Sequence, residues 1–383
     1  MKKIWPFLFH FFFFAAASGL FPFTALYYQS IGLSGAQIGL LAGSAPLITL
    51  IGAPLWTGIA DASHRHKLVM SFTTIVAIVC TLIIPALRNF AVLFPLVLLY
   101  AFMSAPIPSL GDSATMSMLA DQREMYGRIR LGGTIGWGVM AFISGVVIDR
   151  NGIVWAYWIY AVGMTLTLLV SQGLVFNKVD KQESFWSGVG TLLANRRWVL
   201  FLGMAFICGV GLASINTYQF VYLAEIGASK SLMGLSLTIS TLSELPVMFF
   251  GDRLLRRFQA HGLLVLGMIV IGVRVLLYAA FNTPIAILTL QLMHGFTFPA
   301  IWIAGVSYAH ENAPNALKAT AQGLFGAAMM GIGAAVGSFF GGLLIGSIGG
   351  RGMYLVFGAL VLVSVAFFTL IEHYRSVSHA KIV

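Results

Sequence analysis

The chain has 383 residues, of which 59% are hydrophobic and 9% charged, with a mean hydropathy of +0.91 and a formal net charge of +10. This composition excludes a soluble globular protein, which would need far more charge on its surface, and indicates a polytopic membrane protein. The positive charge does not indicate nucleic-acid binding, because the lysines and arginines lie in short loops beside apolar runs, as membrane orientation requires.

Apolar runs long enough to cross a bilayer follow one another along the whole chain. They lie near 5–28, 36–60, 68–87, 91–119, 131–148, 153–175, 198–223, 231–251, 261–281, 284–309, 317–346 and 352–373. The first run resembles a cleavable signal peptide around Ala15 to Ser18. Its apolar character continues to about residue 28, however, which favours an uncleaved first transmembrane helix. We therefore predict an all-α polytopic membrane protein with twelve transmembrane helices.

The basic residues predict how these helices are oriented. Of the 22 lysines and arginines, Arg88, Arg150, Lys230 and Arg351 lie in loops on one side, Arg274 lies inside a span, and the other seventeen lie on the side of the N-terminus. The positive-inside rule then places both termini in the cytoplasm, and we expect a multi-pass protein of the plasma (inner) membrane.

A repeat divides the chain. The segment 31–40, IGLSGAQIGL, is echoed at 226–235 by IGASKSLMGL, and each copy leads through an apolar run to a loop with an aspartate and basic residues, at Asp61 and at Asp252-Arg253. We predict two pseudo-symmetric six-helix halves, 1–176 and 198–383, joined by a cytoplasmic loop at 177–197. In such proteins the substrate site lies between the halves near mid-membrane.

The first half carries one polar set. Asp112 lies inside the fourth span, where an ionised carboxylate is costly unless it has a partner or a function. Arg130 at the start of the fifth span is the natural partner, and Trp137, seven residues later, shares its helix face. An indole can stack on a sugar or a base. The alternatives are a structural salt bridge and a tryptophan that only packs.

The second half carries another polar set: Glu244, Arg274 and His294 lie in three spans that are otherwise uncharged. Ionisable groups in this position predict a proton relay, with Glu244 as the proton carrier. His294 is suited to titration near neutral pH or to hydrogen bonding with the solute. The alternative is a static Glu244–Arg274 bridge beside a core histidine.

The spacing of the glycines bears on helix packing, and the absence of several motifs bears on the function class. Two sets of closely spaced glycines predict close helix approach: Gly132, Gly133 and Gly136, and then Gly333, Gly337 and Gly341. The sequence has no histidine–cysteine cluster at metal-ligand spacing and no nucleotide-binding fingerprint. We therefore expect no enzyme, no cofactor and no metal site.

The two halves and the two aspartate-basic loops resemble the major facilitator superfamily. The segment YGRIRLGGTIGWG at 126–138 is similar to the branch that holds lactose permease, the nucleoside–proton symporters and the phenylpropionate permeases. Further matches to this branch are Met248 to Phe250, Val273-Arg274, Leu292 to Phe296, and Ser347 to Val356.

The resemblance implies roles for particular residues. Asp112 and Arg130 would correspond to a carboxylate–arginine pair that binds sugar hydroxyls, and Arg274 and His294 to the proton-coupling cluster of lactose permease. Loops like those at Asp61, Asp252 and Arg253 latch the halves together during gating. The sequence departs from the pattern at Gln291 and Thr297, where lactose permease has a lysine and the proton-carrying glutamate.

We expect a monomeric secondary active transporter, surrounded by membrane lipid, that imports a small polar solute together with protons by alternating access. The expected solute ligands are Asp112, Arg130, Trp137 and His294, and the expected coupling residues are Glu244, Arg274 and His294. The solute is a sugar or glycoside, or else a nucleoside. The alternatives are uptake of an aromatic carboxylate such as a phenylpropionate, proton-driven export of amphipathic compounds, and a receptor or lipid-handling protein that does not transport.

Overall fold

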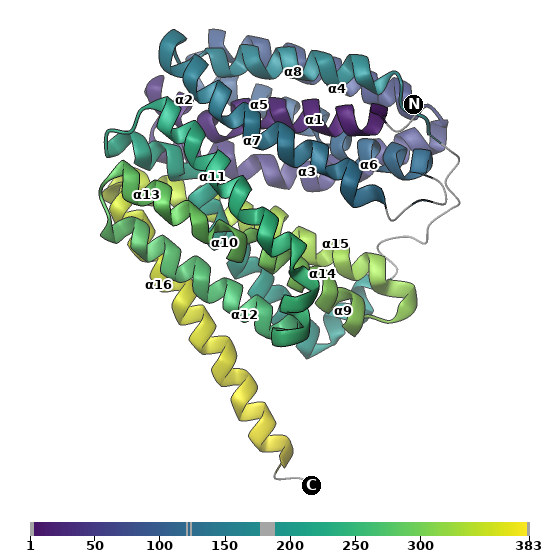
Figure 1. Ribbon diagram of the computed structural model, residues 1–383, viewed down its shortest axis with the longest axis vertical. Coiled ribbons are helices and arrows are strands. Elements are labelled where there is room, and N and C mark those ends of the chain that lie inside the picture. Colours follow the sequence, from purple (N-terminus) through teal and green to yellow (C-terminus); the bar gives the residue numbers. More distant parts are fainter. Residues whose placement is uncertain (1–3, 120–121, 123–124, 177–187, 381–383) are drawn as a thin grey trace. The chain divides into compact units, whose positions relative to one another are not determined.

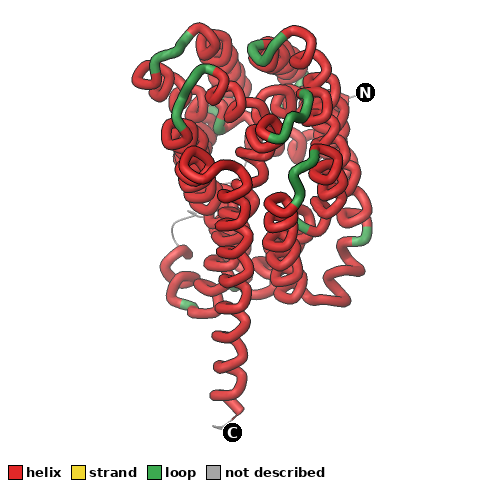
Figure 2. The backbone as a smooth tube through the Cα atoms, turned by 90° about the vertical axis from the view of Figure 1, so that its left-hand side faces the viewer, coloured by secondary structure: helices red, strands yellow, loops and turns green. Residues whose placement is uncertain are grey.

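The computed structural model describes residues 4–119, 122, 125–176 and 188–380 of the chain. Within these residues all regular secondary structure is helical, and the connections are short (Figure 2). The expected central loop at 177–197 falls partly outside the described residues, and from residue 188 onward it contains the short helix α9 (Val189–Ala194).

The chain forms two compact units. The first is made of Met1–Gln182 and Gln219–Leu242, and the second of Glu183–Tyr218 and Ser243–Val383. Two helices, α10 (Arg196–Glu225) and α11 (Lys230–Phe249), contribute to both units. The division into six-helix halves, which was inferred from the repeat, stays a prediction.

The helices are named as in Figure 1. The first unit also contains α1 (Ile4–Leu20), η1 (Phe21–Phe23), α2 (Thr24–Ser30), α3 (Gly35–Ser63), α4 (His66–Ile83), η2 (Ile84–Ala86), α5 (Phe90–Ser104), α6 (Pro106–Leu119), α7 (Tyr126–Asn151) and α8 (Trp155–Ser171). The second contains α9, α12 (Gly251–Ala280), α13 (Pro284–Leu290), η5 (Gln291–Phe296), α14 (Phe298–Asn312), η6 (Asn315–Leu317), α15 (Lys318–Gly326), the π-helical turn η7 (Ala327–Gly333) and α16 (Ala334–Ala380).

These helices confirm the predicted fold class. In the described part of the chain, ten helical segments are long and apolar enough to cross a membrane. Helix α8 is apolar but shorter, with 17 residues. The last segment, Lys318–Ile371, has 54 residues and contains Gly349 at φ 73°, where the helix breaks. Counting α8, and dividing the last segment at Gly349, gives the twelve predicted spans.

The repeated segments form the same turn. Gly32 after α2 has φ 86° and Gly227 after α10 has φ 83°, in the left-handed region that glycine adopts without steric cost. Two residues further on, the hydroxyl oxygens of Ser34 and Ser229 each accept a backbone N–H from the first turn of the next helix. The sequence repeat therefore specifies the helix stop and the helix start that follows it.

In the first unit, α1 packs on α7 and on α8. A Cβ atom placed on Gly132 would lie 2.6 Å from the carbonyl oxygen of Phe7, and one on Gly136 would lie 3.0 Å from the carbonyl carbon of Phe11. Two backbones can approach this closely only where one helix has no side chain. The predicted close approach at these two glycines is confirmed.

In the second unit, the glycines of η7 and α16 face α10. A Cβ atom on Gly333 would lie 2.6 Å from the carbonyl oxygen of Phe206, and one on Gly337 would lie 2.5 Å from that of Val210. Gly341 faces the ring of Tyr218 at the next step along the helix. The predicted packing seam is therefore confirmed.

We predict that Gly136→Val lowers stability by about 2 kcal/mol, because the added methyl groups force α7 away from the backbone of α1. Thermal unfolding of the purified protein measures the effect. Gly127→Ala is the matched control, since Gly127 is exposed on the same helix with no atom near its Cβ position. Equal melting temperatures for Gly136→Val and the wild type would contradict the packing argument.

Candidate functional site

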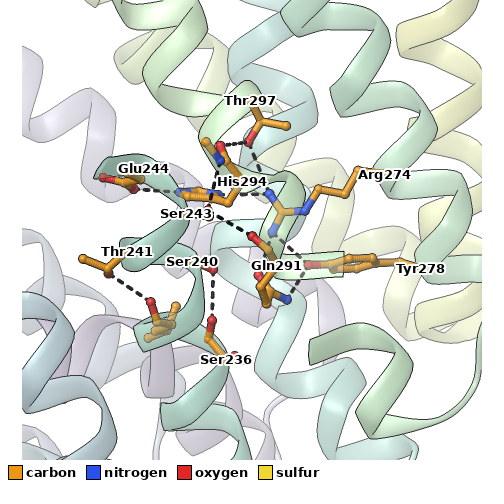
Figure 3. A network of polar contacts seen from close by, with 12 residues as sticks. Ser236, Ser240, Thr241, Ser243, Glu244, Arg274, Tyr278, Gln291, His294 and Thr297 are labelled. Carbon is orange, nitrogen blue, oxygen red and sulfur yellow. Dashed lines mark hydrogen bonds and ion pairs between the residues drawn. The ribbon is translucent and has the colours of Figure 1, made fainter. Parts of the chain in front are cut away.

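The second unit holds a chain of three ionisable residues, the Glu244 cluster, of which Arg274 is fully buried and the other two are partly buried (Figure 3). Glu244 lies on α11, Arg274 on α12 and His294 on η5. Nη1 of Arg274 lies 3.0 Å from Nδ1 of His294, and Nε2 of His294 lies 3.0 Å from Oε1 of Glu244. The predicted coupling residues are thus brought together, with the histidine between the arginine and the carboxylate.

The hydrogen bonds assign the tautomer of His294. An arginine side chain only donates, so Nδ1 of His294 must accept and therefore carries no hydrogen. The hydrogen of the neutral ring is then on Nε2, which donates it to the carboxylate of Glu244. A direct Glu244–Arg274 bridge, the alternative considered from the sequence, is not the arrangement found.

The remaining contacts of Arg274 are to neutral groups. Its Nη2 donates to Oε1 of Gln291 at 2.6 Å and to Oη of Tyr278 at 3.0 Å, and its Nη1 also donates to Oγ1 of Thr297 at 3.2 Å. Gln291 and Thr297 are the two departures from the lactose permease pattern, and both accept hydrogen bonds from this arginine. Among the described residues no carboxylate oxygen lies within 4.0 Å of Arg274, so Glu244 balances its charge through the histidine.

The span that carries His294 is broken at this point. Helix α13 ends at Leu290, η5 follows, and Thr297 has non-helical angles (φ −94°, ψ −91°) before α14 begins. Ser243, next to Glu244, forms hydrogen bonds with backbone groups at the break. Its hydroxyl donates to the carbonyl of Gln291 at 3.2 Å and accepts the N–H of Gly295 at 3.1 Å. Irregular backbone at membrane depth is tolerated only where it is satisfied in this way, and transporters build their sites at such breaks.

Exposure is graded along the cluster. The side chain of Glu244 is 22% exposed and that of His294 14%, whereas Arg274 is 0% exposed. The carboxylate is therefore the accessible end of the cluster, and the arginine is its enclosed end.

The first unit holds a second set, the Asp112 cluster, made of His10, Asp112, Thr115, Tyr126 and Arg130. Oδ1 of Asp112 accepts the hydroxyl of Tyr126 at 2.9 Å and lies 3.7 Å from Nε2 of His10. That nitrogen donates to Oγ1 of Thr115 at 3.2 Å, because the threonine hydroxyl itself donates to the carbonyl of Gly111. His10 is 2% exposed, whereas the side chain of Asp112 is 42% exposed.

The predicted partner of Asp112 lies elsewhere in this structure. The guanidinium carbon of Arg130 lies 4.1 Å from the centre of the Phe14 ring, a cation–π contact. Among the described residues no ion pair within 4.0 Å joins Arg130 to Asp112. The charge of Arg130 nevertheless lies close enough to interact electrostatically with Asp112 and with Tyr126. Trp137 is partly buried on the same helix. The solute-binding roles of these residues stay predictions.

The candidate gating residues lie at helix ends. Nε2 of His66 donates to Oδ1 of Asp61 at 2.7 Å, across the turn between α3 and α4. Asp252 lies in the first turn of α12, where the helix dipole favours a negative charge, and Arg253 lies over the ring of Phe250 at 5.1 Å. Their gating role stays a prediction.

Sequence reasoning missed several members of these clusters. His10 lies in a phenylalanine-rich run where a histidine is conspicuous, and that was the available signal. Ser243 and Tyr278 carry no signal of their own, because serine and tyrosine are ordinary residues of a span. The break near His294 was signalled by Gly295 and Pro299, which weaken a helix on either side of it.

Across the described residues, the apolar helices and the ionisable groups between them are those expected of an integral membrane transporter. The chain belongs to the MFS_1 like family, whose model matches residues 5–356. It is 28% identical to the maltose permease of Geobacillus stearothermophilus over 95% of this chain and 93% of that protein. It is 24% identical to the candidate nucleoside transporter YegT of Escherichia coli (strain K12) over 84% and 79% of the two chains.

Solved structures agree on the fold. The crystal structure of the nucleoside transporter NupG superimposes with a TM-score of 0.84 over 97% of this chain and 99% of that one, at 18% sequence identity. An identity this low establishes the fold alone. The resemblance to the major facilitator superfamily that the sequence predicted is confirmed.

We predict that Arg274→Lys destabilises the protein by about 3 kcal/mol, because an ammonium cannot serve four acceptors in a fixed plane and a buried charge would lose partners. The measurement is thermal unfolding in detergent. Arg150→Lys, a change of the same type at the exposed end of α7, should leave the melting temperature within about a degree of the wild type. A variant as stable as the wild type would show that the four contacts of Arg274 contribute little.

Proposed function

We propose that this transporter moves a small polar solute together with a proton, and that Glu244 is the residue that carries the proton. The observation that supports the proposal is the Glu244–His294–Arg274 chain, in which an accessible carboxylate is joined through a neutral histidine to a fully buried arginine. Ionisable groups placed in this way within membrane spans are costly and therefore mark ion pathways.

The chain suggests how a proton would act. Oε1 of Glu244 already accepts the N–H of His294, so an incoming proton would bind Oε2. Neutralising the carboxylate would weaken the charge-assisted hydrogen bond to His294 by about half. It would also leave Arg274 without its counter-charge. Protonation would thereby loosen the contact of α11 with the broken span α13–α14, and this contact is the element that we propose to change between the two states.

For the solute we propose Asp112, Arg130 and Trp137 of the first unit, with His294 of the second. A sugar or glycoside is the first choice, and a nucleoside the second. Asp112 supports both, because its side chain is 42% exposed and Tyr126 bonds to only one of its two carboxylate oxygens, so the carboxylate can accept further hydroxyl groups. The names of the two curated relatives, a maltose permease and a candidate nucleoside transporter, point the same way.

A second candidate solute is an aromatic carboxylate. The observation that favours it is the position of Arg130 over Phe14: within the described residues no carboxylate pairs with this guanidinium, which is therefore suited to a bidentate contact with an acid. Import as the direction, the plasma (inner) membrane, cytoplasmic termini and a monomeric state belong to the proposal as well. The distribution of basic residues supports the orientation.

We predict that Glu244→Gln abolishes accumulation driven by a proton gradient and leaves solute exchange intact. With one proton per solute, a membrane potential of about 100 mV supports an accumulation of about 50-fold. The variant should only equilibrate the solute, because its amide cannot take up the proton. The assay is uptake into proteoliposomes, run with and without a potential, with counterflow as the measure of exchange. Glu311→Gln, an exposed carboxylate on α14, is the control. Retained accumulation in Glu244→Gln would rule out this carrier.

We predict that two substitutions distinguish the solute classes in a binding assay against sugars, nucleosides and aromatic acids. For a sugar or nucleoside, Asp112→Asn and Arg130→Gln should each weaken binding by about 10- to 100-fold, the worth of a hydrogen bond to a charged group. For an aromatic acid only Arg130→Gln should do so. Arg128→Gln removes an exposed charge two residues away and should have no effect. If neither variant changed binding, the solute site would not be at Asp112.

A further inference from the structure

A pocket of about 450 Å³ opens on the first unit, remote in sequence from both clusters. It lies between the turn that joins α3 to α4, residues 64–68, and the segment that follows α8, residues 174–176. We call it the α4–α8 pocket. Two cationic side chains, Arg65 and Lys67, line it together with apolar residues from both segments.

Local contacts hold the walls of this pocket in place. Helix α3 ends at Ser63, and its C-cap residue His64 adopts the left-handed conformation (φ 54°), so that α4 can begin at His66. Nζ of Lys67 donates to the carbonyl of Gln172 at 2.7 Å, which ties the start of α4 to the end of α8. The ring of His66 stacks on that of Phe176 with 5.2 Å between their centres. These contacts join the two walls of the pocket.

The pocket carries unbalanced positive charge. Arg65 and Lys67 are exposed, and in the described part of the chain neither takes part in an ion pair within 4.0 Å. The carboxylate near this turn, Asp61, is engaged by His66 and does not line the pocket. Lys67 gives one ammonium hydrogen to Gln172 and keeps two. The first turn of α4 adds the positive end of its dipole. These positive charges favour the binding of an anion.

The rim of the pocket identifies the kind of anion. Leu68 is 58% exposed and Val175 is 48% exposed, at the ends of two membrane-spanning helices. A soluble anion makes no use of such apolar surface. A molecule that has both an anionic headgroup and acyl chains fits the cationic floor and the apolar rim at once.

We propose that the α4–α8 pocket binds the phosphate headgroup of an anionic phospholipid. Arg65 and Lys67 contact the phosphate, and Leu68 and Val175 contact the first carbons of the acyl chains. The bound lipid joins the α3–α4 turn to the end of α8 within the first unit. The site is separate from solute binding and from proton coupling, so it stands whether or not the proposed transport function is correct.

Native mass spectrometry of the purified full-length protein tests this site, with phosphatidylglycerol as the probe and phosphatidylcholine as the neutral comparison. The double variant Arg65→Gln/Lys67→Gln should bind phosphatidylglycerol about 30-fold more weakly than the wild type, as the loss of two contacts to an anionic lipid implies. The control Arg196→Gln/Arg197→Gln removes the same charge from the exposed start of α10 and should bind like the wild type. The exchange Arg65→Lys/Lys67→Arg keeps both charges and should retain binding.

Four results would overturn the proposal. The first is an equal loss of phosphatidylglycerol in the Arg196/Arg197 control, which would reduce the effect to net charge. The second is equal binding of phosphatidylcholine, which would remove the role of the anionic group. The third is displacement of phosphatidylglycerol by millimolar inorganic phosphate, which would assign the pocket to a soluble anion. The fourth is loss of phosphatidylglycerol binding in the exchange Arg65→Lys/Lys67→Arg, which keeps both charges.

Discussion

A guanidinium buried inside a membrane protein needs an acceptor for its hydrogens and a counter-charge within reach. Arg274 obtains the acceptors from Gln291, Tyr278 and Thr297, and the counter-charge from Glu244 by way of His294. Gln291, His294 and Thr297 lie on one interrupted span, which supplies three of the four acceptors, whereas Nε of the arginine has no hydrogen-bond partner among the described residues. The interruption releases backbone groups, and the hydroxyl of Ser243 bonds to two of them.

Each unit contains a carboxylate, a histidine and an arginine inside its spans, but the two sets are connected differently. In the second unit the histidine links the other two groups. In the first unit His10 bonds to Thr115, Asp112 bonds to Tyr126, and Arg130 lies over Phe14. The carboxylates differ accordingly in exposure, 42% for Asp112 and 22% for Glu244. This difference supports the proposed division of roles, in which the Asp112 cluster contacts the solute and the Glu244 cluster takes up the proton.

The helical class, the twelve spans and the repeat could be predicted because each depends on local chemistry. A bilayer requires about 20 apolar residues per span, and the chain meets this requirement again and again. The two Ile-Gly turns use glycine in the same left-handed conformation, so the repeated letters carry a repeated backbone geometry. Close helix packing at the glycines of α7 and α16 could also be predicted, because glycines that recur on one face of a span allow another helix to approach closely.

The sequence by itself identified Asp112, Glu244, Arg274 and His294 as ionisable residues of apolar runs, because such residues stand out there, although His10 was missed. Only the tertiary structure decided how they are connected: that His294 stands between Glu244 and Arg274, that Gln291 and Thr297 are ligands of the arginine, and that Asp112 turns to Tyr126 instead of Arg130. The physical reason is that these partners come from different helices. Their pairing depends on how the helices pack and rotate against one another, whereas periodicity and spacing along the chain describe one helix at a time.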